Sequence, residues 1–292
     1  MESNVVTTSR LGKVSALLVM SLVFLGLIGG SSAAAPTTIG GTYFAGYLDA
    51  GATRQVCRSW FDLNDYGPIV ASGLASNYGI VITVKSTQVQ FLGDGYLRYC
   101  ATLTNASSRG SDVYLTLRAQ LSSAHVLATP LPGLAPGARG LYCFSFNYKS
   151  MTGPVAVSAT PKYAGAELAT VRVDLEHRQG YGWVYCASIL NSSAVDSGSF
   201  TLRAKSGLTS SNSFNYYAGY LSAGATQRYC FNYPPAATPA SVIGAAVEYN
   251  ARIATLSVDR ENRFNYGYVY CATIRNLSSI GTGVNLQTQA GL

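Results

Sequence analysis

The stretch YGYVYCATIRNLSS, from Tyr266 to Ser279, has the alternating pattern of a half-buried β-strand that ends in a polar turn. Two close copies occur earlier in the chain, as GYLRYCATLTNASS from Gly95 to Ser108 and as GWVYCASILNSS from Gly182 to Ser193. Every copy contains one cysteine and includes an Asn-x-Ser sequence near its end. One strand-and-turn unit therefore occurs three times in the sequence. This repetition indicates that the chain is built from repeated units.

The cysteines show that the repeat extends beyond this strand. Alternate cysteines are about 86 residues apart, and a constant period of this kind marks an internal repeat. A second segment keeps the same register, because AGYLDAGATRQVC (Ala45–Cys57) matches AGYLSAGATQRYC (Ala218–Cys230) and has a degenerate middle copy in PGLAPGARGLYC (Pro132–Cys143). The six cysteines are Cys57, Cys100, Cys143, Cys186, Cys230 and Cys271.

The composition favours an all-β protein. The chain has 21 tyrosines and only 3 methionines, and after its first segment no long run has apolar residues at helical spacing. Each repeat contains about six short strand-like runs separated by turn signals, which is typical of a small immunoglobulin-like β-sandwich. We therefore predict three tandem immunoglobulin-like repeats, at residues 36–120, 121–206 and 207–292.

The first segment has the features of a secretion signal. Arg10 and Lys13 precede the apolar stretch Val14–Ile28, and small residues follow around Ala33–Ala35. The apolar stretch is short for a membrane-spanning helix, which needs about 20 residues. We predict a signal peptide at residues 1–34 and an exported mature chain outside the membrane. Retention of the segment as an N-terminal anchor is the alternative.

The net charge of +7 does not indicate a nucleic-acid partner. The basic residues are scattered singly and form no run or stripe, and export separates the chain from nucleic acid. The positive net charge is instead consistent with a mild attraction to acidic glycans or lipids.

The cysteines predict three disulfide bonds. Disulfides stabilise small exported domains, whereas two histidines and no CxxC motif give little support for a zinc site. Along the repeated strand, Tyr185, Ala187 and Ile189 alternate with Cys186, so the cysteine points away from the apolar core face. Cys143 alternates with aromatic neighbours in the same way. We therefore expect bridges on the outer face, between neighbouring strands of one sheet.

The Asn-x-Ser sequences fall at Asn105, Asn191 and Asn276, and the chain has no other Asn-x-Ser/Thr. In an exported protein this pattern predicts N-glycosylation at a surface turn. The alternative is structural, because Asn and Ser are good turn formers and duplication copies the turn. A turn alone does not require a serine two residues after each asparagine, and this favours the glycan.

One segment resembles a known class of module. The pattern CATLTNASS…LTLRAQL…LAPGARGLYCFSF (Cys100–Phe146) resembles bacterial and archaeal surface modules of the CARDB type, in which a strand ending in Asn-x-Ser comes first. That order implies two whole modules at 88–174 and 175–260, with bridges Cys100–Cys143 and Cys186–Cys230. The linear order instead implies the bridges Cys57–Cys100, Cys143–Cys186 and Cys230–Cys271.

The shifted order leaves a half-module at each end of the chain. Two half-modules that complete each other make a head-to-tail contact, and such a contact builds a filament when its rotation does not close a ring. Donated strands also cover open sheet edges. In composition and leader the chain looks like archaeal surface threads and bundling pili, families of secreted, glycosylated, β-rich subunits joined by donated strands.

The sequence contains no recognisable catalytic constellation. His125 and His177 have no counterparts in the other repeats and are expected at the surface, and neither a GxSxG nor an HExxH motif is present. Trp60 and Trp183 are candidates for sugar stacking, but Trp183 shares a face with the apolar residues of its strand and is expected in the core. We predict no enzyme, no cofactor and no metal site.

Paired carboxylates recur in two repeats. Asp174 and Glu176 match Asp259 and Glu261, two residues apart on one face of a strand. Such pairs serve glycosidases or calcium sites. Arginines close by in the sequence favour a solvated, salt-bridged strand instead; they are Arg172, Arg178, Arg260 and Arg263.

These features together predict a secreted, glycosylated, disulfide-bonded structural subunit of a cell-surface filament or pilus, whose partner is a second copy of itself. The alternative is a monomeric surface adhesin that binds cell-surface glycans. Formation of polymers would support the filament subunit. Binding of a monomer to polysaccharide would support the adhesin.

Overall fold

The computed structural model describes residues 38–59, 69–120, 126–146, 155–206, 213–232, 240–265 and 267–290. All the regular secondary structure in these ranges is β-strand. No helix long and apolar enough to cross a membrane occurs there. The predicted signal peptide, Trp60 and His125 lie outside the described residues.

The described residues form eighteen strands in three sets of six, which we call modules 1, 2 and 3. Module 1 contains β1 (Thr38–Leu48), β2 (Thr53–Ser59), β3 (Ile69–Ala75), β4 (Val81–Gly93), β5 (Tyr96–Asn105) and β6 (Ser111–Gln120). Module 2 contains β7 (Val126–Leu131), β8 (Arg139–Phe144), β9 (Val155–Thr160), β10 (Glu167–Arg178), β11 (Gly182–Asn191) and β12 (Phe200–Ser206). Module 3 contains β13 (Ser213–Leu221), β14 (Thr226–Asn232), β15 (Ala240–Ala246), β16 (Arg252–Arg263), β17 (Gly267–Asn276) and β18 (Thr282–Ala290).

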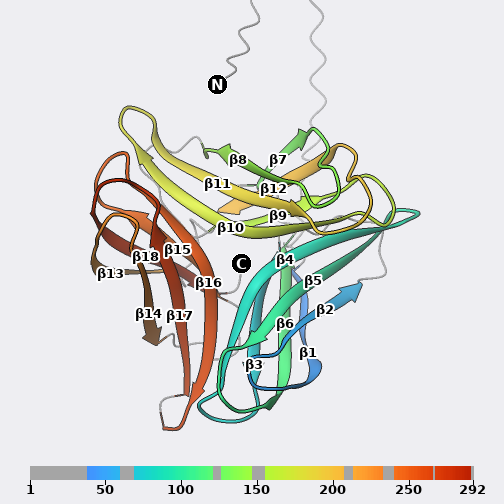
Figure 1. Cartoon of the computed structure of the whole chain (residues 1–292), viewed down its shortest axis with the longest axis horizontal. Helices are drawn as coiled ribbons and strands as arrows, with labels where there is room; N and C mark the ends of the chain where they lie inside the picture. The colour runs from blue at the N-terminus through green and yellow to red at the C-terminus, as the bar shows by residue number, and fades with distance from the viewer. Residues whose placement is uncertain are drawn as a thin grey trace, which may run out of the picture. The chain divides into compact units, whose positions relative to one another are not determined.

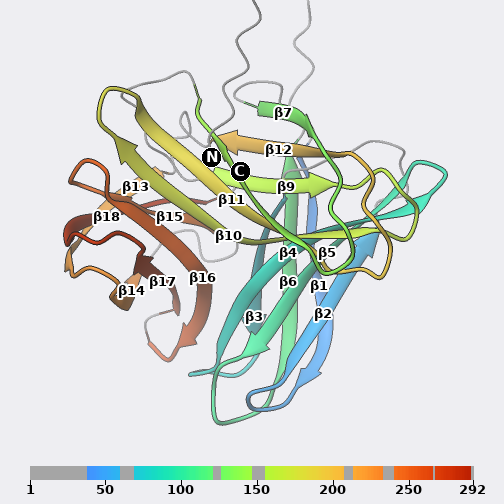
Figure 2. The ribbon, with the colours of Figure 1, turned by 45° about the horizontal axis from the view of Figure 1, so that its top comes forward.

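Strand pairing is the same in every module. The first, sixth and third strands form one antiparallel sheet, in the orders β1-β6-β3, β7-β12-β9 and β13-β18-β15. Figure 2 shows β7, β12 and β9 side by side. The second, fifth and fourth strands form the other layer, as in β2-β5-β4. Each module is thus of the β-sandwich type and has an apolar cluster, and Ile243 and Ala245 of β15 in module 3 also belong to the cluster of module 2.

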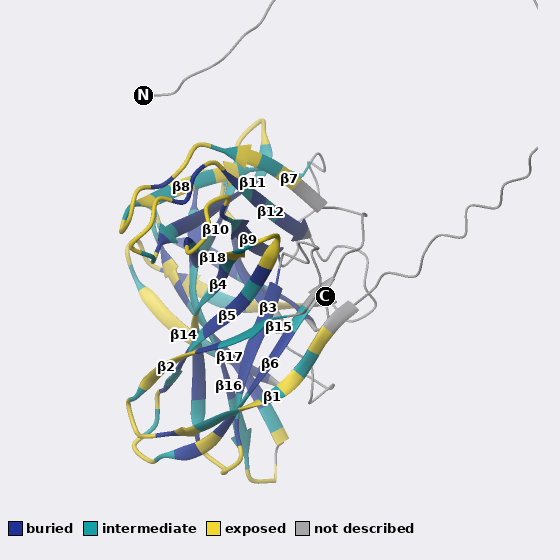
Figure 3. Ribbon diagram, turned by 90° about the vertical axis from the view of Figure 1, so that its right-hand side faces the viewer, coloured by how far each residue is buried: buried dark blue, intermediate teal, exposed yellow. Residues whose placement is uncertain are grey.

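The repeated strand lies at the centre of this arrangement. Tyr185, Ala187 and Ile189 of β11 are at most 1% exposed and belong to the core of module 2. Buried strands appear dark blue in Figure 3, whereas the edge strands β2 and β14 carry many exposed residues. The predicted core face is confirmed in all three copies; the other members are Tyr99, Ala101, Leu103, Tyr270, Ala272 and Ile274.

The disulfides join neighbouring strands of one sheet, as predicted. The bonded cysteines are directly opposite each other in the register of β2 with β5, β8 with β11 and β14 with β17. The pairs are those of the linear order, Cys57–Cys100, Cys143–Cys186 and Cys230–Cys271. The bridges of the shifted order are not formed, and neither end of the described chain is left with an unpaired cysteine.

The expectation that these bridges lie on an open outer face is wrong for one cysteine of each pair. Cys100, Cys186 and Cys271 are fully buried. The reason is the next strand of the sheet, which places a buried polar side chain directly opposite each of them on the same face. These covering residues are Gln88, Asp174 and Asp259.

The long fourth strand of each module also pairs with the other modules. β4, β10 and β16 pair with one another antiparallel, so one nine-stranded sheet runs through all three modules. In Figure 1 the hairpins β4–β5, β10–β11 and β16–β17 meet along these long strands. The modules are therefore joined by backbone pairing as well as by the chain.

Candidate functional site

The candidate site is the set of three pairings between β4, β10 and β16. We call them junction 1/2 (β4 with β10), junction 2/3 (β10 with β16) and junction 3/1 (β16 with β4). Each long strand has a register shift near its middle, at 84–86, 170–172 and 255–257. A bulge of this kind bends a strand. One half of each strand therefore pairs with one neighbour and the other half with the second neighbour.

The backbone geometry repeats at every junction. The N–H of Gly79 donates to the carbonyl of Asn262 at 2.8 Å, and that of Gly165 donates to the carbonyl of Phe91 at 2.7 Å. At junction 2/3 the N–H of Asn250 donates to the carbonyl of His177 at 2.6 Å. Each turn before a long strand thus extends the ladder to the neighbouring module, and the junctions are equivalent in their main chain.

Aromatic side chains cover two of these turns. Tyr249 packs against His177 at junction 2/3, with ring centroids 4.2 Å apart, and His177 stacks on Trp183 at 4.1 Å. Tyr78 meets Phe264 edge to face across junction 3/1. The expectation that His177 is a surface residue is wrong, because it is half-buried between two rings. Trp183 is partly buried and packs on the core of module 2.

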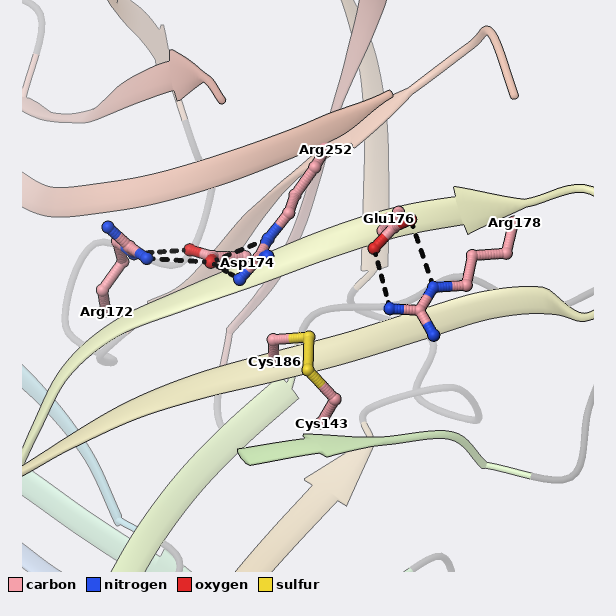
Figure 4. The surroundings of a disulfide bond; sticks show 7 residues. All are labelled: Cys143, Arg172, Asp174, Glu176, Arg178, Cys186 and Arg252. Carbon is pink, nitrogen blue, oxygen red and sulfur yellow. Dashed lines mark hydrogen bonds and ion pairs between the residues drawn. A yellow bond between two sulfur atoms is a disulfide. The ribbon is translucent and has the colours of Figure 1, made fainter. Parts of the chain in front are cut away.

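A buried ion cluster spans junction 2/3. Asp174 is 1% exposed, and Arg172 of its own strand lies 2.7 Å from its Oδ1. Arg252 of module 3 approaches Asp174 Oδ2 with two nitrogens, at 2.5 and 3.0 Å. Figure 4 shows this cluster beside the Cys143–Cys186 bridge. Because a buried carboxylate is costly without partners, Arg252 couples the two modules through the charge of Asp174.

The prediction of a salt-bridged strand is correct, but the prediction that it is solvated is wrong for two of its acids. Glu176 pairs with Arg178 at 3.1 Å and Glu261 with Arg263 at 3.0 Å, at partly exposed sites. Asp174 and Asp259, in contrast, are buried. They sit opposite the buried cysteines of the central strands, where the sheet continues into its next strand.

Module 3 and module 1 satisfy the equivalent position differently. Asp259 pairs with Arg228 of its own module at 2.9 Å, and its Oδ1 has no hydrogen-bond partner among the described residues. Module 1 has the neutral Gln88, whose Nε2 donates to the hydroxyls of Ser86 and Thr102. Among the three junctions, an ion pair that links modules is described only at junction 2/3.

Arg260 is a buried cation at junction 3/1. It is 2% exposed, and its guanidinium carbon lies 4.2 Å from the ring centre of Tyr268 and 5.4 Å from that of Tyr270. None of its three guanidinium nitrogens has a hydrogen-bond partner in the described part of the chain. Burial lowers the pKa of Arg260, against the opposing influence of the two tyrosines.

The alternation of the strand contained a signal for this residue. Val89, Leu175 and Arg260 all face the buried cysteine strand at Tyr99, Tyr185 and Tyr270. Because the equivalent residues of the other repeats are valine and leucine, the position of Arg260 could have been predicted to lie in the core. Sequence reasoning instead grouped Arg260 with the solvated arginines.

The three asparagines are buried rather than displayed. Asn105, Asn191 and Asn276 have no exposed surface. The side-chain nitrogen of Asn191 donates to the carbonyls of Leu134 and Val195, both at 2.8 Å. The other two asparagines make the equivalent pairs of bonds. The prediction of surface acceptors is therefore wrong for the folded molecule, because the nitrogen that would carry a glycan is enclosed and already donates twice.

The serine two residues later also has a structural reason. The hydroxyl of Ser107 accepts the N–H of Val81 at 2.7 Å, and that of Ser278 accepts the N–H of Arg252 at 2.6 Å. In module 2 the hydroxyl of Ser193 donates to Asn191 Oδ1. These bonds tie the turn to the start of a long strand in modules 1 and 3. The repeated Asn-x-Ser is thus explained by backbone satisfaction.

A small pocket lies where the long strands bend. It has a volume of about 140 Å³ and is lined by strand bends and by β3, β9 and β15. Its lining is largely apolar, with Lys85 and Arg172 as its charged residues. In the described ranges, no three His, Cys, Asp or Glu side chains gather where they could hold a metal ion.

Comparison of the chain with protein-family models, with curated proteins and with solved structures gave no match. The junctions between the modules consist of main-chain pairing, buried hydrogen bonds and ion pairs.

Proposed function

We propose that this chain is a structural subunit of an extracellular, cell-surface filament or pilus and that copies assemble head to tail through their strands. The observation that carries the proposal is the pairing of β4, β10 and β16 between modules. Main-chain pairing at sheet edges joins separate chains as readily as parts of one chain. We also propose that the three β-sandwich modules are immunoglobulin-like.

The proposed route of assembly is not the one expected from the shifted module order, in which half-modules of two copies complete each other. Every module has its own internal disulfide, so the described strands include no half-module that another copy would complete. Assembly by strand complementation then takes place at the edges of complete modules. Glycosylation at the three buried asparagines is not part of this proposal.

The proposed location rests on redox chemistry. Three disulfides and no free cysteine indicate an oxidising compartment such as the cell exterior. Secretion through the predicted leader and attachment to the cell surface follow as proposals. The role is proposed to be structural rather than enzymatic.

The test is self-assembly of the mature chain without reductant. Sedimentation velocity and negative-stain electron microscopy over a wide concentration range are expected to show linear polymers that grow with concentration. A protein that stays monomeric at every concentration and ionic strength would contradict the proposal.

Exposed aromatic residues favour a second candidate, a glycan-binding adhesin. Phe44 and Tyr47 on β1 are 56% and 54% exposed, and Tyr217 and Tyr220 on β13 are 61% and 64% exposed. Exposed aromatic rings offer stacking faces for sugars. Retention of a monomer on polysaccharide beads, lost in Tyr217→Ala together with Tyr220→Ala, would support the adhesin over the filament.

A further inference from the structure

The three junctions share one backbone geometry but differ in the side chains that meet across them. On the core face, Val89 is directly opposite Leu168 at junction 1/2, and Leu175 is opposite Ile253 at junction 2/3. All four are apolar and at most 1% exposed. These two junctions therefore bury apolar surface against apolar surface, which stabilises them in water.

Junction 3/1 breaks this pattern. The position equivalent to Val89 and Leu175 is occupied by Arg260, directly opposite Ile82. Arg260 is 2% exposed, and its nitrogens have no hydrogen-bond partner among the described residues. Two tyrosine rings offset part of the cost of burying this charge. A buried, incompletely satisfied charge weakens this junction relative to the other two.

The polar contacts on the outer face also indicate that junction 3/1 is the weakest of the three junctions. Arg252 crosses junction 2/3 to the buried Asp174, and Gln55 crosses junction 1/2 to donate to Glu167 at 3.0 Å. At junction 3/1 the described ion pairs of Asp259 and Glu261 both stay within module 3. Tyr78 and Phe264 pack edge to face across this junction, but no polar side-chain bond between modules is described there, whereas each of the other two junctions has one.

Chain connectivity makes the same junction special. Modules 1 and 2 follow one another in the chain, as do modules 2 and 3, whereas modules 1 and 3 are not consecutive and meet through junction 3/1 and through contacts of β3 with β15 and β16. Opening this junction leaves the rest of the molecule connected. It frees two complementary edges, Val81–Val84 of β4 and Val258–Glu261 of β16.

We infer that junction 3/1 is the seam through which copies of this chain assemble, with Val258–Glu261 of one molecule pairing with Val81–Val84 of the next. This inference rests on the proposed filament function and names its interface. The contact is heterologous, since one surface of each copy meets a different surface of the next, and repeats of it build a chain. The ladder formed between molecules is the one that closes within a single molecule.

Arg260 then sets the rate of assembly. Because the same contacts form within a molecule and between molecules, Arg260 burdens both states to a similar degree. What it lowers is the barrier to opening, since the guanidinium regains water when the seam separates. Substitution by the apolar residue of the equivalent position is expected to slow opening.

The first experiment locks the seam with a new disulfide. Val81 and Glu261 are directly opposite across junction 3/1, and Gln90 and Glu167 hold the equivalent positions across junction 1/2. The variant V81C/E261C is expected to lose concentration-dependent polymers under oxidising conditions. The matched variant Q90C/E167C is expected to keep them. A disulfide map by mass spectrometry confirms that each lock has formed.

The outcomes separate this inference from the proposed function. Polymers in the locked V81C/E261C variant would overturn the seam but leave the filament standing on another interface. Loss of polymers in both locked variants would mean that rigidity in general, not this seam, is limiting, and would also overturn it. An unmodified protein that never polymerises contradicts the filament itself.

The second experiment observes the seam in dilute, monomeric protein. Amide hydrogen exchange in residues 81–84 and 258–261 is expected to be about tenfold faster than in the equivalent residues of junction 2/3, 173–176 and 252–255. Arg260→Leu is expected to slow exchange at the seam and delay polymer growth. Arg275→Leu, an exposed arginine of β17, is the control and is expected to change neither. Equal exchange at both junctions would overturn the inference whatever the polymers show.

Discussion

At the scale of single residues, the three repeated asparagines are buried polar side chains whose amide groups are fully hydrogen-bonded. Asn191 shows the principle most clearly. Its amide donates to two loop carbonyls and its oxygen accepts the N–H of Ser193 at 3.1 Å. Because an unsatisfied buried donor or acceptor is expensive, such a residue tolerates little change. The same logic holds for its two counterparts.

The asparagine clasp can be tested by removing its donor. Asn191→Asp preserves the shape but replaces an amide nitrogen that donates twice with an acceptor facing two carbonyls. We expect a loss of about 3 kcal/mol in the free energy of unfolding, measured by urea denaturation. The exposed Asn77→Asp is the matched control and is expected to change stability by less than about 0.5 kcal/mol. A neutral N191D would contradict the structural role.

Glu248 makes stability depend on pH. Its carboxylate accepts hydrogen bonds from the hydroxyl of Thr282 and from the N–H of Gly283, and these bonds lower its pKa in the folded state, the contact with Thr282 most of all. A folded-state pKa below the unfolded value gives stability that is present above the unfolded value and lost as pH falls through the folded value.

We therefore expect the free energy of unfolding to decline below about pH 4.5, the ordinary glutamate range, and E248Q to flatten part of that decline. Urea denaturation at a series of pH values measures the slope. Asp49→Asn, at an exposed carboxylate after β1, is the control. An identical slope in E248Q and the unmodified protein would refute the assignment.

At the scale of elements, the long strands decide how the modules join. Each of β4, β10 and β16 bends at a bulge and so serves two neighbours. The resulting junctions have the same backbone bonds and different side chains. Junction 2/3 has an ion cluster, and junction 3/1 has a buried arginine.

The ion cluster at junction 2/3 predicts a large effect of Arg252. Arg252→Leu leaves the buried Asp174 with Arg172 as its remaining partner. We expect a loss of about 2–3 kcal/mol in the free energy of unfolding, somewhat less than full removal of a buried partner. Arg263→Leu, which breaks a more exposed pair of the same strand, is the control and is expected to cost less than about 1 kcal/mol. Equal losses in the two variants would argue against coupling through Asp174.

At the scale of the whole molecule, the modules are neither independent beads nor halves that need another copy. Each has its own disulfide, yet one sheet runs through all of them, and β15 of module 3 contributes to the apolar cluster of module 2. Such a molecule should unfold as a single cooperative unit, because loss of one module removes sheet partners from the other two.

Removing one disulfide tests this cooperativity. The Cys230–Cys271 bridge closes a loop of 41 residues, and C230A/C271A is expected to cost about 4 kcal/mol. Calorimetry is expected to show one transition at a lower midpoint. Two separate transitions, with modules 1 and 2 melting at the original temperature, would contradict coupling between the modules.

Periodicity in the sequence was sufficient to predict the strands. The period of the cysteines and the alternation around Tyr185 and Cys186 predict the repeat, the all-β class, the core face and bridges within one sheet. These features are local, because strand geometry places successive side chains on opposite faces whatever the rest of the chain does.

Only the tertiary structure decided which residues of the outer face are covered. The alternation within a single strand predicts that Asp174, Asp259 and the cysteines of the central strands face solvent. They are buried because a further strand continues the sheet beside them. The sequence around Asn191 predicts a surface turn, but the residue is enclosed because a loop 57 residues earlier brings the carbonyl of Leu134 to its amide nitrogen. Burial depends on contacts distant in sequence, and a local pattern does not contain them.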